Sequence, residues 1–100
     1  MHDRRRFRIT LDLGKSVSVG NDLITIAAIA ERPSFAGLKT PHKEVMLSID
    51  SMRATYQTVW MVELSELFMR DWSVSIVELT FGQAKLYIHA PQEIKIERVK

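Results

Sequence analysis

The chain of 100 residues contains no cysteine, which excludes a disulfide framework and a thiolate metal site. Proline and glycine are scarce, with three and four residues, and no apolar run approaches the ~20 residues that cross a membrane. The basic segment at residues 1–6 is not followed by an apolar segment, so we expect no secretory signal. These absences favour a protein of the cytoplasm without a membrane contact.

Apolar residues make up 46% of the chain and charged residues 26%, which is the composition of a folded globular domain. The length suits a single domain over residues 1–100. The net charge is only +2, but basic residues gather at both ends, at positions 4–8 and 95–100. If the two ends meet in the fold, they form a basic patch, whereas separate ends would be solvated tails.

Most of the chain alternates between apolar and polar residues, the period of a strand with one buried face. This pattern predicts strands over 7–13, 16–19, 23–29, 74–81, 84–89 and 94–98. Pro33, Gly37 and Pro41 predict a loop over 31–42, and residues 44–49 fit either a strand or a helix. Pro91 separates the last two strands, because proline has no N–H for a ladder. No internal repeat is apparent.

From residue 50 the apolar residues recur with the spacing of a helix, which predicts a helix at about 51–71. It lies in an apparent insertion at about 31–72. The helix would be apolar on more than one face, so it packs either against a second subunit or within its own chain. The positions that carry this pattern are Met52, Tyr56, Val59, Trp60, Leu64, Leu67 and Phe68.

Few residues suggest chemistry. The histidines, His2, His42 and His89, lack the i,i+3 or i,i+4 spacing of a metal motif, so we expect no metal and no cofactor. Glu63 and Glu66 are one helical turn apart, and a solvated face explains them better than acid–base catalysis. We therefore expect no enzymatic activity.

The arginines of the first segment follow the R-x-x-x-R pattern, from Arg4 to Arg8, which resembles the start of PilZ domains. Those domains bind cyclic-di-GMP and also carry a D/N-x-S-x-x-G segment. The nearest segment here, at 50–54, does not match it. A PilZ-like cyclic-di-GMP binder is therefore the weaker alternative.

Two segments resemble a known family. Residues 13–26 resemble the signature G-E-x-I-x-I-G-D-x-I-x-V, and residues 83–98 resemble Q-V-R-I-G-I-x-A-P-x-x-V-x-V-x-R. Both signatures, in this order, are those of the carbon storage regulator (CsrA) family. The resemblance implies a small, mainly β domain that forms an intertwined homodimer, here with an inserted α-helix, as in a family variant that carries such a helix.

The resemblance also implies a function, because family members bind GGA motifs in single-stranded RNA loops and regulate translation. The RNA, an mRNA or a small regulatory RNA, lies between the first strand of one subunit and the last strand of the other. The positions of this chain that match that composite site are Arg8, Ile9, Thr10, Ala90, Pro91, Gln92, Ile94, Ile96 and Arg98.

Three departures leave alternatives open. Leu11 and Asp12 stand where the family usually has two arginines, and Gln92 replaces a usual lysine. A related dimer that has lost RNA binding, and that regulates through a protein partner held by the insertion, is therefore an alternative. Either 23–29 or 74–81 could be the family's third strand.

Overall fold

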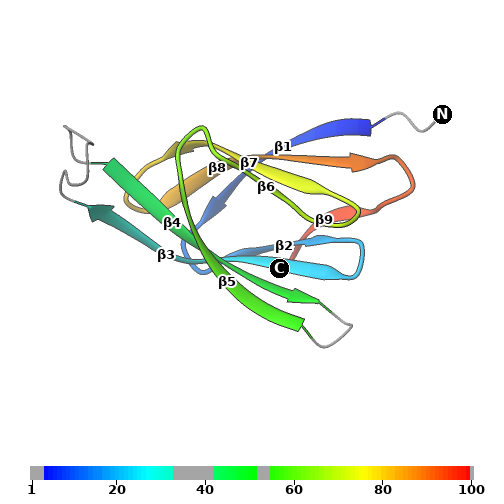
Figure 1. The fold of residues 1–100 in the computed structure, drawn as a ribbon, viewed down its shortest axis with the longest axis horizontal. Coiled ribbons are helices and arrows are strands. Elements are labelled where there is room, and N and C mark those ends of the chain that lie inside the picture. The colour runs from blue at the N-terminus through cyan, green and yellow to red at the C-terminus, as the bar shows by residue number, and fades with distance from the viewer. Residues whose placement is uncertain (1–3, 33–41, 52–54, 100) are drawn as a thin grey trace.

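The computed structural model describes residues 4–32, 42–51 and 55–99, which form nine β-strands and no helix (Figure 1). In this part of the chain, no helix could cross a membrane. The strands are β1 (Arg4–Asp12), β2 (Ser16–Val19), β3 (Asp22–Arg32), β4 (His42–Ser51), β5 (Thr55–Val62), β6 (Glu66–Phe68), β7 (Ser73–Leu79), β8 (Gln83–Pro91) and β9 (Ile96–Val99).

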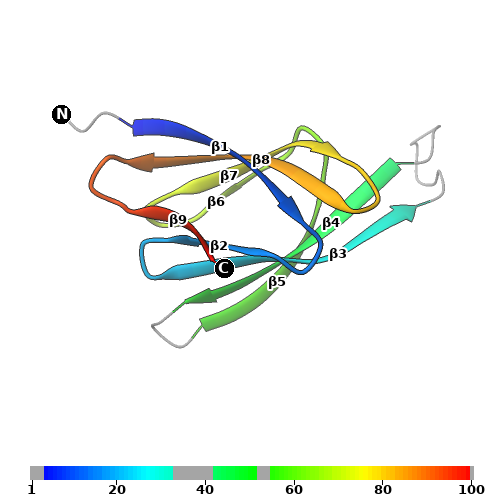
Figure 2. The same cartoon turned by 180° about the vertical axis from the view of Figure 1, so that it is seen from behind.

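The strands form two antiparallel sheets, with the orders β1-β8-β7-β6 and β5-β4-β3-β2-β9. Figures 1 and 2 show the sheets as two layers that enclose a common interior. At one side of the molecule the edge strands are β1 and β9, and at the other side they are β5 and β6. The first and last strands of the chain therefore close the same side.

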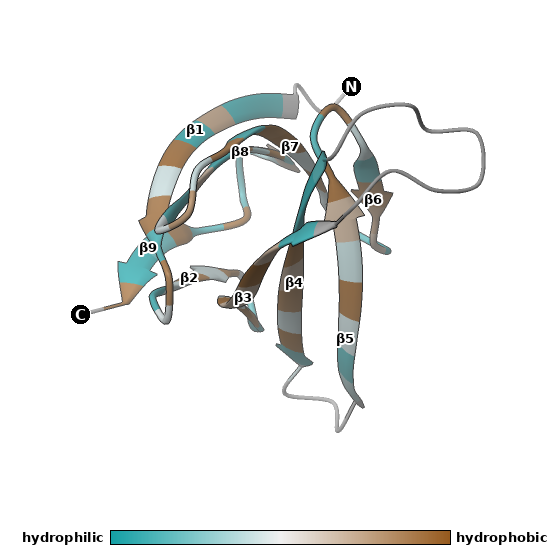
Figure 3. Cartoon of the chain, turned by 90° about the vertical axis from the view of Figure 1, so that its left-hand side faces the viewer, coloured by the Kyte–Doolittle hydropathy of each residue, from teal (hydrophilic) through white to brown (hydrophobic). Residues whose placement is uncertain are grey.

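The core lies between the layers and is built by alternation, because successive strand residues point to opposite faces. In β8, Ala84, Leu86, Ile88 and Ala90 are fully buried, whereas the residues between them are not. Figure 3 shows the same alternation of hydrophobic and hydrophilic residues along β1. The mainly β fold class is thus confirmed.

The predicted helix at 51–71 is wrong, because residues 55–62 and 66–68 form β5 and β6. The cause is visible in β5. There, Val59 and Met61 face the core, whereas Tyr56, Trp60 and Val62 are apolar but exposed on the opposite face. Apolar residues on both faces hide the period of two and imitate a helix. Residues 52–54, where that helix would begin, lie outside the described part of the chain.

The apparent insertion at 31–72 is not separate from the sheets, because β4, β5 and β6 are integral strands of both. The resemblance implied that the end strands pair with a partner chain. Here β1 pairs with β8, and β9 pairs with β2, within one chain. The pairings expected of an intertwined dimer are therefore satisfied inside a single molecule.

The backbone of the chain contains an internal repeat, which is not apparent in the sequence. Gly14 N–H donates to the Ile26 carbonyl over 2.8 Å, and Leu64 N–H donates to the Ile76 carbonyl over 2.7 Å, each residue 50 positions later. The return bonds, from Ile26 to Lys15 and from Ile76 to Ser65, repeat in the same way. Strands β1 to β4 therefore form a first half, and β5 to β8 form an equivalent second half.

The registers of the strands confirm this equivalence. The β3–β4 ladder shifts between Ile26 and Ala28, and the β7–β8 ladder shifts at the equivalent place, between Ile76 and Glu78. Each half gives its first strand to the fourth strand of the other half, as β1·β8 and β5·β4. Strands β3 and β7, the two candidates for the family's third strand, thus hold equivalent positions.

Candidate nucleic-acid interface

Strands β1 and β9 belong to different sheets, yet side chains join them along one side of the molecule. The Arg98 Nη1 donates to the Thr10 carbonyl over 3.0 Å, and the Arg5 Nη2 donates to the Ile94 carbonyl over 2.8 Å. Because both contacts advance in the same chain direction, the two strands run parallel. We call residues 5–10 and 94–98 the β1–β9 edge.

Main-chain groups of both strands face the space between β1 and β9. The Lys95 carbonyl accepts from Gly20 N–H and so points toward β2. Since peptide groups alternate sides along a strand, those of Ile94, Ile96 and Arg98 point toward β1. The Thr10 carbonyl accepts from Arg98 and so points toward β9. Because main-chain groups alternate along β1, those of Arg6 and Arg8 also point toward β9. Such groups can read the edges of unstacked bases.

The edge is mainly basic. Exposed basic side chains at Arg5, Arg6, Arg8, Lys95 and Arg98 surround it, against the carboxylates of Glu93 and Glu97. Glu97 lies 3.0 Å from the Lys95 Nζ, so this carboxylate offsets one of the positive charges. The remaining positive charge is suited to a phosphate backbone.

The residues that the resemblance implied for the site are spread along the length of β1, because Arg98 contacts Thr10 whereas Ala90 and Pro91 pair with Arg5 and Arg4 at the other end of the strand. The side chains of Ile9, Ala90 and Ile96 face the core. Of these three residues, only Ile96 directs its main-chain groups into the space between β1 and β9, because those of Ile9 face β8 and Ala90 pairs with Arg5 in the β1–β8 ladder. Pro91 and Ile94 are half-buried beside them. The exposed side chains in the predicted set are those of Arg8, Gln92 and Arg98, and Thr10 is half-buried.

The structure places two of the three departures, Leu11 and Asp12, away from the basic part of the edge. Leu11 is 1% exposed and belongs to the core, so its position offers no side chain to the edge. The Asp12 Oδ1 accepts a hydrogen bond of 2.8 Å from Gln83 Nε2, at the far end of β1 from Arg5. The carboxylate is thus held by a neighbouring donor, away from the basic end of the edge.

The site predicted from the sequence omitted Arg5, Arg6 and Lys95. Arg6 lies over the ring of Tyr87 on β8, with the guanidinium carbon 4.5 Å from the ring centroid. This cation–π contact holds the arginine at the surface beside the edge. The alternation of residues 4–8 was the available signal, because it predicts that every second arginine points away from the core.

A separate cavity of about 380 Å³ lies between the equivalent turns of the two halves. Its lining includes residues 19–22 and their equivalents 69–72. Across it, Trp72 Nε1 donates to Asp22 Oδ2 over 2.7 Å, so two equivalent positions bind each other. No group of metal-ligating side chains occurs among the described residues, and the hydrogen bond from Trp72 to Asp22 joins the two halves at this cavity.

Comparisons with known proteins identify no relative. No family model matches the chain, and neither a curated protein nor a solved structure matches it.

Proposed function

We propose that the chain binds single-stranded RNA at the β1–β9 edge and acts as a post-transcriptional regulator of the carbon storage type. The observation that carries the proposal is the contact of Arg98 with the Thr10 carbonyl, because it joins the two segments that the family resemblance assigns to one RNA site. A single chain supplies both strands, so RNA binding does not require a homodimer.

The chemistry of the edge supports RNA over the cyclic dinucleotide. Unpaired bases present their edges to main-chain N–H and C=O groups, while arginines contact phosphate or guanine. The β1–β9 edge offers both kinds of group along the length of two parallel strands. A GGA sequence in a hairpin loop is the ligand that the family resemblance implies.

The test is titration of the protein with a fluorescent RNA hairpin that carries GGA in its loop, at several salt concentrations. We expect binding that weakens as salt rises, because phosphate contacts release counterions. Arg98→Ala is expected to weaken binding by about tenfold, or ~1.4 kcal/mol. Arg98→Lys separates charge from geometry, because lysine lacks the planar fork of donors.

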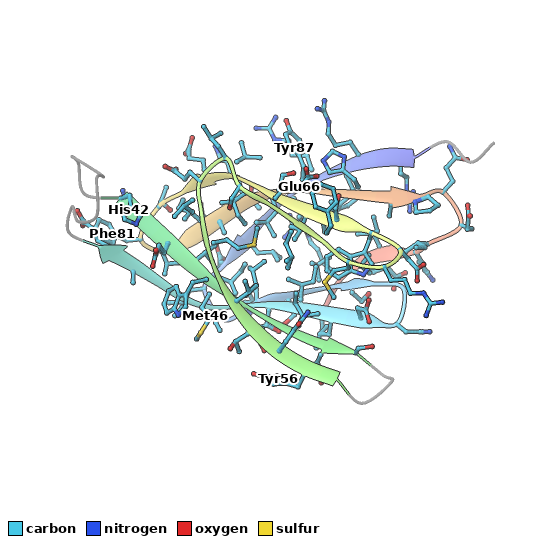
Figure 4. All side chains as sticks on the ribbon, in the orientation of Figure 1. His42, Met46, Tyr56, Glu66, Phe81 and Tyr87 are labelled. Atoms are coloured by element: carbon cyan, nitrogen blue, oxygen red, sulfur yellow. The ribbon has the colours of Figure 1, made fainter. Side chains whose placement is uncertain are left out.

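Lys43→Ala is the matched control, because it also removes one positive charge. Lys43 lies 5.2 Å from the centroid of the Phe81 ring, and Phe81 stands at the end of the molecule opposite the N-terminus (Figure 4). This variant should bind RNA like the unmodified chain. Equal losses in Arg98→Ala and Lys43→Ala, or no binding to the GGA hairpin at low salt, would contradict the proposal.

A further inference from the structure

Strand β9 lies outside the repeat and adds to β2 of the first half, and in the described part of the chain no strand takes the equivalent place in the second half. Strand β2 lies between β3 and β9, whereas its equivalent, β6, pairs only with β7. Strand β9 also contacts β1 of the first half, and the equivalent of β1 in the second half is β5. Among the described residues, no strand pairs with the outer edges of β5 and β6. We call these two edges the β5–β6 edge.

The side chains at this edge are apolar where those of the first half are polar. Trp60 is 42% exposed and Phe68 is 70% exposed, and they stand at the positions equivalent to Thr10 and Ser18. The full set of exposed apolar residues with their equivalents is Tyr56 for Arg6, Trp60 for Thr10, Val62 for Asp12, Leu64 for Gly14 and Phe68 for Ser18. The apolar surface therefore gathers where the strand is missing.

Strand β5 also lacks the features that protect an edge strand from pairing. Natural proteins blunt such edges with charged residues, proline or a bulge. The eight residues of β5 include no charged residue and no proline, and the β4–β5 ladder has no register shift. Its outer edge is therefore open to another strand.

We propose that the β5–β6 edge binds an extended segment of a partner protein, which adds to β6 in the position that β9 takes on β2. RNA does not suit this edge, because β5 carries no basic residue and β6 carries Glu66. A second copy of β6 suits it poorly, because that strand has three residues and would not reach β5. A separate extended segment lies along both edges at once. This inference does not rest on RNA binding.

The β2–β9 register gives the chemistry of the segment. Ile96 pairs with Val19, and the equivalent of Val19 is Met69, so the first residue is apolar. Glu97 pairs with Ser18, whose equivalent is Phe68, so an aromatic residue suits the second position.

The next two positions of the segment are basic. Arg98 pairs with Val17 and reaches the Thr10 carbonyl. A long basic residue at the third position would likewise pass Leu67 in the direction of Trp60 on β5. The fourth position pairs with Glu66, whose Oε2 accepts from Ser73 Oγ over 3.1 Å and lies 4.0 Å from His89 Nε2, and the negative charge of this cross-strand neighbour favours lysine or arginine. The partner segment therefore reads apolar, aromatic, basic, basic.

The test uses a labelled synthetic peptide that copies residues 92–100 with two changes, Glu97→Phe and Val99→Lys. We expect a saturable rise in fluorescence anisotropy when the full chain is added. A peptide with Glu97→Pro is the control, because position 97 faces the receiving strand and proline has no N–H to donate. This control peptide should not bind.

The protein variants replace exposed residues by their equivalents from the first half. Trp60→Thr combined with Phe68→Ser should weaken peptide binding about tenfold, because aromatic anchors carry most of the energy of such an interface. Phe81→Ser is the matched control, since Phe81 is 68% exposed but lies on the β7–β8 turn. This variant should bind the peptide normally, and circular dichroism verifies that each variant folds.

Three outcomes overturn the proposal. The first is the absence of saturable binding, and the second is binding that Trp60→Thr with Phe68→Ser leaves unchanged. The third is a dimer, in sedimentation velocity of the chain alone, that the same two substitutions dissociate, because a second copy would then be the occupant. Retention of GGA-hairpin binding in the double variant separates this test from that of the proposed function.

Discussion

The two halves of the molecule share one backbone arrangement and differ in their surfaces. In the first half, β1 presents exposed Arg6 and Arg8, and in the second half β5 presents Tyr56 and Thr58 at the equivalent positions. The first half is covered by β9, and the second has no such strand in the described part of the chain. One backbone arrangement thus supports a basic edge on one side and an apolar edge on the other.

A pair of cross-strand contacts shows how far the surfaces have diverged. Arg6 lies over Tyr87, and at the equivalent positions the Ser48 hydroxyl donates to the Tyr56 hydroxyl over 2.7 Å. Tyr56 and Tyr87 lie on opposite outer faces of the sandwich (Figure 4). The same diagonal geometry holds a cation–π contact in one sheet and a neutral hydrogen bond in the other.

The difference teaches that burial constrains the interior far more than the surface. Ile24 and Val74 are equivalent, and each is fully buried. Exposed substitutions usually change stability by only ~0.5 kcal/mol, so the outer faces of the two halves can carry different residues without loss of the fold. The following predictions test this view, beginning with the largest expected effect.

The two tryptophans should differ most. Trp72 is 1% exposed and donates to Asp22, so Trp72→Ala should lower the free energy of unfolding by about 3–5 kcal/mol, measured by urea denaturation. Trp60→Ala should cost less than about 1 kcal/mol, because Trp60 is partly exposed at the β5–β6 edge. Similar losses for both variants would show that the β5–β6 edge is part of the core.

Moving arginines between the halves tests whether position or net charge binds RNA. Arg6→Tyr with Arg8→Thr gives β1 the residues of β5 and should weaken GGA-hairpin binding by about ten- to hundredfold. The slope of log affinity against log salt should fall by about two phosphate contacts.

The compensated variant adds Tyr56→Arg and Thr58→Arg, which restores the net charge. We expect its affinity for the hairpin to stay low, because no strand like β9 lies beside β5 in the described part of the chain. Recovery of affinity in an anisotropy titration would mean that net charge alone binds the RNA.

The equivalent turns at positions 14 and 64 differ in backbone strain. Gly14 has φ of 87° and Leu64 has φ of 67°, a region that side chains other than glycine rarely adopt. No atom lies within 4 Å of a Cβ built at Gly14, so Gly14→Leu should cost about 1–2 kcal/mol from backbone strain alone. Thermal unfolding measures this loss.

The reciprocal change, Leu64→Gly, should raise the free energy of unfolding by up to about 1 kcal/mol. The gain is smaller because glycine loses more chain entropy on folding. A loss of stability in this variant would indicate that Leu64, which is 89% exposed, contributes packing that offsets its strain.

The smallest effect is expected from the two surface tyrosines. Tyr56→Phe removes the acceptor of the Ser48 hydroxyl and should cost about 0.5–1.5 kcal/mol. Tyr87→Phe keeps the ring under Arg6 and should cost less. Urea titrations of both variants, fitted with a common slope, resolve the difference, and an equal cost would remove the contrast between the two sheets.

Most strands could be predicted from alternation, but the second half could not be recognised as a copy of the first. Over residues 11–29 and 61–79, Ile26 and Ile76 are the only identical equivalent pair. Backbone hydrogen bonds require no particular side chain, so the bonding pattern outlasts sequence similarity. The misassigned helix has the same origin, because Tyr56 and Trp60 are exposed where the first half has polar residues.

The family resemblance could name residues of the first and last strands as one RNA site, and that role stays a prediction. The construction of the β1–β9 edge could not be predicted, since Arg5, Ile94, Thr10 and Arg98 are far apart in sequence. Their contacts depend on how the sheets stack, and no local pattern reports this.

By itself, the sequence determined which residues face the core in most strands, because these strands carry their own alternation of apolar and polar residues. Strand β5 is the exception, since it has apolar residues on both faces. The tertiary structure alone decided that β1 pairs with β8 and β9 pairs with β2 in the same chain, and that β6 is the edge strand of its sheet. The physical reason is that alternation specifies a buried face, whereas the choice of neighbouring strand depends on the combined burial of both sheets.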